Sequence, residues 1–375
     1  MAHSYTPGLR VAKRTVIQKD RILPLKGEVV KKVGEIISRD EIVAKTDLPG
    51  NISTMNIVNL LGIQADEIGQ FMKKNVGDSF EKNEIIAENK SFIKWFSTQI
   101  KAPIKGSIES VSNVTGQVLL RQPPLPIEVQ SYINGKVIEV VPNEGVIIET
   151  VCSFIQGIFG IGGETWGTLK FAVTSSDEEL DVSKITSEYK DCVIVGGAFA
   201  DYNAIQKAIE VGVKGIIVGG IKDEDLRKLL GYDLGVAITG SENIGITVVL
   251  TEGFGKMNMA KRTWNCLKDR ENSTASISGA TQIRAGVIRP EIIIPYDDAD
   301  LDHSAMEERE AKPVVIGNSV RIIRQPYFGK IGEVTELPSA LCAIESETHA
   351  RVLMVKFDDG EIVTIPRANI ELIEE

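Results

Sequence analysis

The residues best suited to binding chemistry lie between positions 191 and 295, where three β-branched runs each end in glycine. Paired glycines let a small anion or a nucleotide-like group approach the backbone, and an arginine can clamp a carboxylate or phosphate with two donors. A ligand of this segment would contact Gly196, Gly197, Gly219, Gly220, Thr251, Glu252, Gly253 and Arg284. Strand-to-helix turns also need glycine for steric reasons alone, and no turn here has the G-x-G-x-x-G pattern of a dinucleotide site. The sequence therefore favours the steric role and keeps the ligand site as its alternative.

Catalytic side chains are scarce in this chain. His3, His303 and His349 all lie outside the strand-end turns, so neither a Ser-His-Asp nor a Cys-His arrangement is supported. The four cysteines form no C-x-x-C pair, which is typical of free thiols in a reducing compartment. Glu252 and Arg284 could perform carboxylate chemistry only if folding brought them together. We expect no catalytic residue, no metal and no cofactor.

The elements that position these residues follow the rhythm of an α/β unit. Three apolar strands are each followed by a helical pattern, at residues 192–197 and 202–211, 215–220 and 223–230, and 246–253 and 258–269. Parallel strands need crossover helices, and helices on both faces allow strands that are apolar throughout. The pattern predicts a layered α/β domain, in which Arg284 and Arg289 either bind a ligand or pair with an acid such as Glu252 at a domain seam.

Composition narrows the class of protein. The 375 residues are 43% hydrophobic and 25% charged, as in ordinary globular proteins, and this length predicts two or three domains. A formal charge of −10 argues against wrapping nucleic acid by bulk electrostatics. Residues 1–27 have no signal-peptide core, and no run of about 18 apolar residues occurs. We expect a cytoplasmic protein that does not contact a membrane.

Part of the β-rich region over residues 21–175 is repeated. Residues 31–44 (KKVGEIISRDEIVA) match residues 73–87 (KKNVGDSFEKNEIIA) with one residue inserted. Residues 106–111 (GSIESV) and 135–140 (GKVIEV) add a second recurring strand type, each opening at glycine. Two copies of one β unit are therefore expected.

The repeated V-G-[D/E] and E-I-[V/I]-A pattern, followed by APIKGSI at residues 102–108, resembles the barrel-sandwich hybrid fold of biotinyl and lipoyl carrier domains. In carriers a lysine at a hairpin tip takes the cofactor, and Lys90 falls near that place by this resemblance. The Met-Lys-Met of biotin acceptors is absent, and the segment after Lys90 is long for a two-stranded tip. We therefore expect Lys90 to be a solvated lysine beside the aromatic residues Phe92, Trp95 and Phe96.

A second glycine-rich segment spans residues 154–167 (FIQGIFGIGGETWG). A phosphate-binding loop would carry G-K-[S/T], and no basic residue follows here before Lys170. The segment predicts a tight turn whose apolar residues pack between domains, or alternatively a loop that lies against a ligand or partner.

The last 63 residues form a separate β pattern of four strands with an Asp-Asp-Gly turn at residues 358–360. The motifs G-N-x-V-x-I-I, P-Y-F-G-K-I-G-x-V and V-K-F-D-D-G resemble the KOW domain, a small barrel of NusG-type transcription factors and ribosomal proteins. By this resemblance, the loop that meets RNA or a protein partner would contain Arg321, Arg324, Tyr327, Phe328 and Lys330. Residues 313–375 contain six Lys or Arg and ten Asp or Glu, so the module carries a net negative charge. Contact with a protein, or a purely structural role, is therefore at least as well supported as contact with RNA.

We predict a multidomain α/β plus all-β protein, in which independent barrels flank a layered nucleus. Its predicted parts are an N-terminal extension (1–20), a barrel-sandwich-hybrid-like region (21–175), a linker (176–190), an α/β domain (191–296), an acidic linker (297–312) and a KOW-like barrel (313–375). The predicted function is a non-catalytic cytoplasmic adaptor or scaffold for a protein or RNA partner, such as the transcription or translation machinery. The alternatives are a small-ligand-binding or enzymatic α/β protein with a pocket at the glycine-ended strands, and a homo-oligomeric scaffold.

Overall fold

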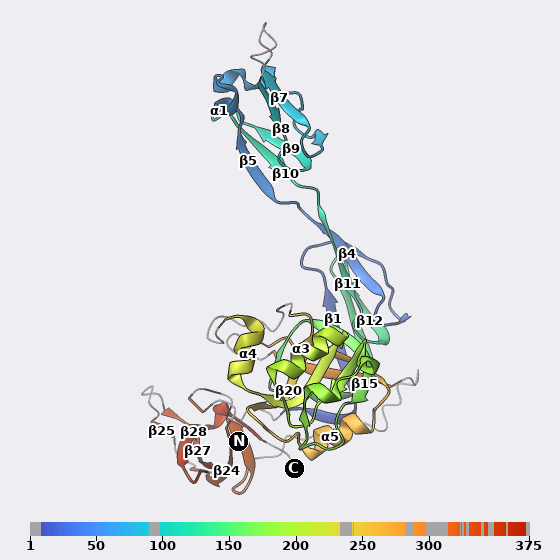
Figure 1. Cartoon of the computed structure of the whole chain (residues 1–375), viewed down its shortest axis with the longest axis vertical. Helices are drawn as coiled ribbons and strands as arrows, with labels where there is room; N and C mark the ends of the chain where they lie inside the picture. Colours follow the sequence, from blue (N-terminus) through green and yellow to red (C-terminus); the bar gives the residue numbers. More distant parts are fainter. Residues whose placement is uncertain are drawn as a thin grey trace.

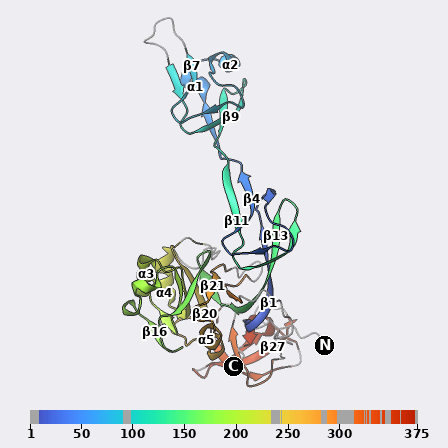
Figure 2. The ribbon, with the colours of Figure 1, turned by 90° about the vertical axis from the view of Figure 1, so that its right-hand side faces the viewer.

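The chain folds into a body, a long arm and a C-terminal module, and it consists mostly of β-strands in several sheets (Figure 1). The structure, a computed structural model, describes residues 9–89, 98–232, 242, 244–281, 288–296, 314–322, 324, 326–327, 330–338, 341–343, 349–357 and 359–372. Figures 1 and 2 both show the arm extending away from the body and the C-terminal module lying beside the body, away from the arm.

A 13-stranded sheet forms the body. Its main path, in spatial order, is β14 (Phe159–Ile161), β20 (Thr247–Phe254), β19 (Gly215–Ile221), β17 (Cys192–Val195), β15 (Glu164–Phe171), β21 (Thr274–Ser278), β22 (Glu291–Pro295), β13 (Gly145–Gln156), β12 (Gly135–Val141) and β3 (Ile36–Ile37). Off this path, β1 (Val11–Ile22) pairs with β13, and β16 (Glu179–Leu180) pairs with β18 (Phe199–Ala200). Strands β15, β17, β19 and β20 are parallel to one another, as crossover connections require.

The three expected helices form beside these parallel strands: α3 (Tyr202–Val211), α4 (Asp223–Leu230) and α5 (Lys261–Lys268). Asp201 caps the start of helix α3, because its carboxylate accepts the Ala204 N–H, and Gly212 caps the end of the helix in the left-handed region with φ 86°. Ile194 packs in the cluster that contains α3 and α4, whereas Val193 and Val195 pack in the cluster that contains α5. Apolar cover on both faces explains why every residue of β17 and β19 is buried.

The sheet crosses two boundaries that the sequence predicts. Residues 11–20 of the predicted extension lie in β1, which pairs with β13. Strand β13 also pairs with β22, so the N-terminal β region and the α/β segment share one sheet. Residues 176–190 are not a plain linker, since Leu180 in β16 is buried and the short helices η3 (Val182–Lys184) and η4 (Ser187–Tyr189) follow. The layered nucleus is therefore continuous with its N-terminal neighbour.

The arm contains a stalk and a tip. The stalk is a three-stranded sheet of β2 (Glu28–Val29), β4 (Ile42–Leu48) and β11 (Leu125–Gln130). The tip contains β5 (Ile52–Asn56), α1 (Ile57–Leu61), η1 (Ala65–Glu67), α2 (Ile68–Phe71), β6 (Ser79–Phe80), β7 (Ile85–Asn89), β8 (Thr98–Lys101), β9 (Gly106–Val111) and β10 (Gln117–Arg121). An apolar cluster that includes Ile57, Phe80 and Leu120 belongs to the tip alone. The tip therefore has its own core.

The predicted repeat has the same local structure in both copies. Gly34 and Gly77 each adopt a left-handed conformation, with φ 91° and 92°. The Gly34 N–H donates to the Val137 carbonyl, and the Gly77 N–H donates to the Ile108 carbonyl, both at 2.8 Å. Each copy of the repeat is thus bound to one copy of the second recurring strand. One copy lies at the stalk and the other in the tip, which is inserted between β4 and β11.

The C-terminal module is a five-stranded antiparallel sheet with a core of its own. Its strands, in spatial order, are β28 (Ile362–Pro366), β27 (Val352–Phe357), β24 (Ile331–Glu336), β23 (Ser319–Ile322) and β29 (Ile370–Leu372). A short hairpin of β25 (Cys342–Ala343) and β26 (His349–Ala350) and the helix η6 (Arg367–Asn369) complete it. The four expected strands form, and β29 is a fifth. The acidic segment 297–312 and Lys90 lie outside the described residues.

Candidate functional site

The glycine-ended turns of the parallel strands are filled by backbone. A Cβ on Gly219 would lie 2.0 Å from the Met257 carbonyl oxygen, and a Cβ on Gly220 would lie 2.2 Å from the Gly255 carbonyl oxygen. Gly197 adopts φ 66°, and a Cβ there would lie 2.2 Å from the Glu178 carbonyl oxygen. Gly196 packs against the Leu180 side chain. These glycines admit neighbouring segments of the chain itself, so the steric role holds at the carboxyl end of the sheet.

Glu252, at the same end of β20, is buried and fully engaged. Its Oε1 accepts the Ala260 N–H at 3.0 Å, directly before α5 begins. Its Oε2 accepts a hydrogen bond from Arg321 Nη2 at 2.7 Å. The adjacent Thr251 hydroxyl is also buried and lies 3.5 Å from the Val218 carbonyl oxygen. The glycine next to Glu252, Gly253, is a buried position of β20, and Arg284 lies outside the described residues. Glu252 thus joins the body to the C-terminal module.

The candidate contact residues of the C-terminal module separate into two groups. Arg321 is 2% exposed and faces Glu252, so its guanidinium does not face solvent. Arg324 is exposed, and Tyr327 is half-buried with its ring 5.5 Å from that of Phe357. The Lys330 ammonium lies 5.5 Å from the Tyr327 ring centroid and is exposed. Phe328 lies outside the described residues. Arg324, Tyr327 and Lys330 therefore remain accessible to a partner, whereas Arg321 does not.

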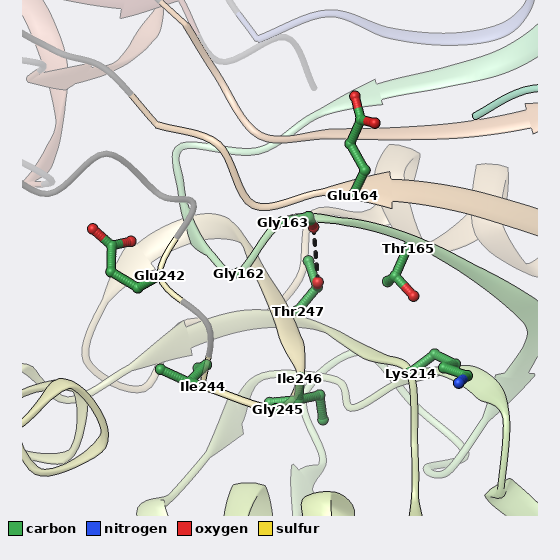
Figure 3. Close-up of a pocket in the computed structure, with 10 residues that line it drawn as sticks. All are labelled: Gly162, Gly163, Glu164, Thr165, Lys214, Glu242, Ile244, Gly245, Ile246 and Thr247. Atoms are coloured by element: carbon green, nitrogen blue, oxygen red, sulfur yellow. Dashed lines mark hydrogen bonds between the residues drawn. The ribbon is translucent and has the colours of Figure 1, made fainter. Parts of the chain in front are cut away.

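A cavity of about 390 Å³ lies at the opposite end of the parallel strands (Figure 3). It is lined by Gly162, Gly163, Glu164, Thr165, Lys214, Glu242, Ile244, Gly245, Ile246 and Thr247. Lys214 directly precedes β19, and Thr247 is the first residue of β20. The cavity therefore opens at the amino ends of these strands, away from the turns that the sequence nominates.

The glycine-rich segment forms one wall of this cavity. Gly162 adopts φ 88°, and a Cβ on Gly163 would meet no atom within 4 Å. The Gly163 carbonyl accepts a hydrogen bond from the Thr247 hydroxyl at 2.9 Å, as Figure 3 shows. The alternative expectation for residues 154–167, a loop beside a ligand, thus concerns the segment that borders the cavity.

The charged groups around the cavity have partners. Arg21 makes a two-bond contact with Glu164, with N–O distances of 2.7 and 2.8 Å. Lys214 lies 3.2 Å from a carboxylate oxygen of Asp191. The Thr165 side chain and the glycine backbone offer uncharged hydrogen-bonding groups along the same wall (Figure 3). The lining therefore suits a small polar ligand better than a highly charged one.

Nucleophile and metal chemistry find little support in the residues that the structure describes. These residues contain no group of three His, Cys, Asp or Glu side chains that could hold a metal ion. Burial raises the pKa of Cys152 to about 12 and that of Cys266 to about 11, so both thiols stay protonated at neutral pH.

No helix within the described ranges is long and apolar enough to span a bilayer.

Two features of the site are not apparent from the sequence. The cavity lies at the amino ends of the strands, away from the nominated turns, although the glycine pair Gly162 and Gly163 before Glu164 is a usable signal. The Arg321–Glu252 pair joins residues from distant parts of the chain.

A scan against protein-family models finds no match to this chain, and a search of curated proteins finds no relative.

Proposed function

We propose that this protein is a non-catalytic adaptor that works in the cytoplasm and uses its arm to hold a protein partner away from the body. The observation that carries the proposal is the position of the tip. It has its own apolar core, and the chain connects it to the stalk at the ends of β4 and β11 (Figure 1). Such an arm contributes nothing to closing a pocket in the body, whereas it suits a spacer between two bound partners.

The finer fold assignments are part of the same proposal. We attribute the repeated units of the arm to the barrel-sandwich hybrid type and the C-terminal module to the KOW type, because of the sequence motifs quoted above. The C-terminal module would contact its protein or RNA partner, from the transcription or translation machinery, through Arg324, Tyr327 and Lys330. Its balance of six basic against ten acidic residues favours a protein there.

Excision of the tip tests the adaptor proposal. Leu48 and Leu125 are antiparallel neighbours, so residues 49–124 can be replaced by an Asn-Gly turn that closes β4 and β11 as a hairpin. Both forms would be used for affinity purification from native lysate, with and without nuclease. We expect a partner that the intact chain retains, that the excised chain loses and that the separate tip competes away. Equal recovery by both chains would refute a binding role for the tip.

A second candidate function is binding of a small polar ligand, which the 390 Å³ cavity favours. Gly163→Leu would fill this cavity, because no atom lies within 4 Å of the position of its Cβ. Thermal-shift screening of nucleotides and small acids should then give a ligand whose stabilisation disappears in Gly163→Leu and persists in the tip-excised chain. Flat responses of the intact chain across the panel would count against this candidate. Light scattering of the same samples, against a chain mass of 40.9 kDa, tests the scaffold alternative.

A further inference from the structure

We propose that the C-terminal module is a releasable cap on the body, closed by the Arg321–Glu252 ion pair. The contact would make binding of any partner to the Arg321 face of the module compete with docking on the body. The proposal concerns a contact within the chain and does not depend on the adaptor function of the arm.

The apolar cores of the two parts are separate, which is the first argument. The module cluster includes Val320, Ile322, Leu353 and Val355, and all its members lie between residues 314 and 372. The clusters of the body contain none of these residues among those that the structure describes. The module therefore has no apolar cluster in common with the body there, and its docking must rely on other contacts.

The orientation of Arg321 is the second argument. Val320 and Ile322 flank Arg321 in β23 and belong to the module core. Alternate residues of a strand point to opposite faces, so Arg321 points away from that core. Its Nη2 reaches Glu252 Oε2 at 2.7 Å, with side-chain exposures of 2% and 8%. Arg321, a buried cation among the described residues of the module, is thus directed at the body.

The energetics of a buried pair are the third argument. Removal of one partner leaves a charge that is buried and uncompensated, whereas the intact pair gives little net stability over two hydrated charges. Glu252 also accepts the Ala260 N–H at 3.0 Å, a contact that lies within the body. A contact of this kind fixes the orientation of the module on the body. Release of the module costs little free energy, because both charges become hydrated when the module leaves the body.

Spin labels on the full chain test the cap directly. One label is placed on the native Cys342, which is partly exposed while the other three cysteines are buried. The other is placed on Lys207→Cys in α3, where the lysine side chain is 40% exposed. In the labelled chain with Arg321 and Glu252 intact, the two spin labels should give one narrow distribution of distances. Glu252→Gln or Arg321→Gln should each raise the ratio of open to closed forms by on the order of 100-fold, seen as a broad distribution of longer distances. Lys330→Gln removes an exposed cation of the same module and should leave the narrow distance unchanged.

The double variant Glu252→Gln/Arg321→Gln shows whether the two substitutions open the module through the same contact or through two independent effects. Because the two charges of the pair are removed together, it should be more closed than either single variant. Narrow wild-type distances in both single variants would overturn the proposal, as would a double variant that opens by the product of the two single effects. Loss of hydrogen-exchange protection at Val355 in Glu252→Gln would also overturn it, since the contact would then belong to the fold of the module itself.

Discussion

Lys19 of β1 and Glu291 of β22 form an ion pair of 2.6 Å within the sheet of the body. Two residues along β1, Arg21 binds Glu164 of β15. Glu164 and Glu291 are both register partners of Ser278 in β21, so the two carboxylates lie on the same face of the sheet. Burial raises the pKa of Glu291, and the nearby charge of Lys19 opposes that shift in part.

This pair predicts a specific pH dependence of stability. A carboxyl whose folded pKa lies above its ordinary value of 4.5 keeps its proton in the folded chain after the unfolded chain has lost it. Its contribution to the free energy of unfolding is therefore present at low pH and declines as the pH rises from about 4.5 through the raised pKa. Glu291→Gln should remove this decline, whose slope is at most about 1.4 kcal/mol per pH unit.

Urea unfolding of both forms, from pH 4 to pH 8, measures that difference. Glu28→Gln is the matched control, because Glu28 makes an ion pair with Lys45 but is 67% exposed. The groups that face Glu291 are Lys19, Arg21 and Glu164, and none of them changes in either variant. Parallel stability curves for the wild type and Glu291→Gln would contradict the prediction.

The sequence predicts the local secondary structure of this protein but not the pairing of strands that are far apart in the chain. The three strand-and-helix pairs of residues 192–269 and the doubled β unit are predictable, because hydrophobic period and glycine position are local signals. The pairing of β13 with β22 is not, since it joins residues more than a hundred positions apart and erases a boundary that composition predicts. The burial of Arg321 was likewise missed, because an arginine in a strand does not reveal which carboxylate will cover it.

Two glycines of the body should respond very differently to alanine. Gly219→Ala places a Cβ 2.0 Å from the Met257 carbonyl oxygen, and backbone cannot move away cheaply. We expect a loss of about 2–4 kcal/mol in the free energy of unfolding, or failure to fold. Gly163→Ala meets no atom within 4 Å and should change stability by less than about 1 kcal/mol. Urea denaturation of both variants makes the comparison, and equal losses would show that close packing is not the reason for Gly219.

Substitution of the equivalent glycine in either copy of the repeat should cost the same free energy of unfolding. Gly34 and Gly77 have φ 91° and 92°, and neither has an atom within 4 Å of the position of its Cβ. Alanine at either position should therefore cost only the left-handed conformation, about 1 kcal/mol. Asparagine tolerates that conformation better and should recover part of the loss. Thermal unfolding of the four single variants tests this, and a large loss at only one position would mean that the two turns are not equivalent.

Thiol labelling should separate the four cysteines by environment. Burial raises the pKa of Cys152 from 9.0 to about 12, so its thiolate fraction at pH 8 falls by roughly 1000-fold. Cys266, at about 11, is affected in the same direction, whereas Cys342 is the one free cysteine that is not buried. Iodoacetamide at pH 8 should alkylate Cys342 first, and Cys152 only as fast as the chain unfolds. Peptide mass spectrometry measures the rates, with urea-unfolded protein as the control in which all four sites react. Equal rates at Cys152 and Cys342 in folded protein would show that the β13 core opens to solvent far more often than its burial implies.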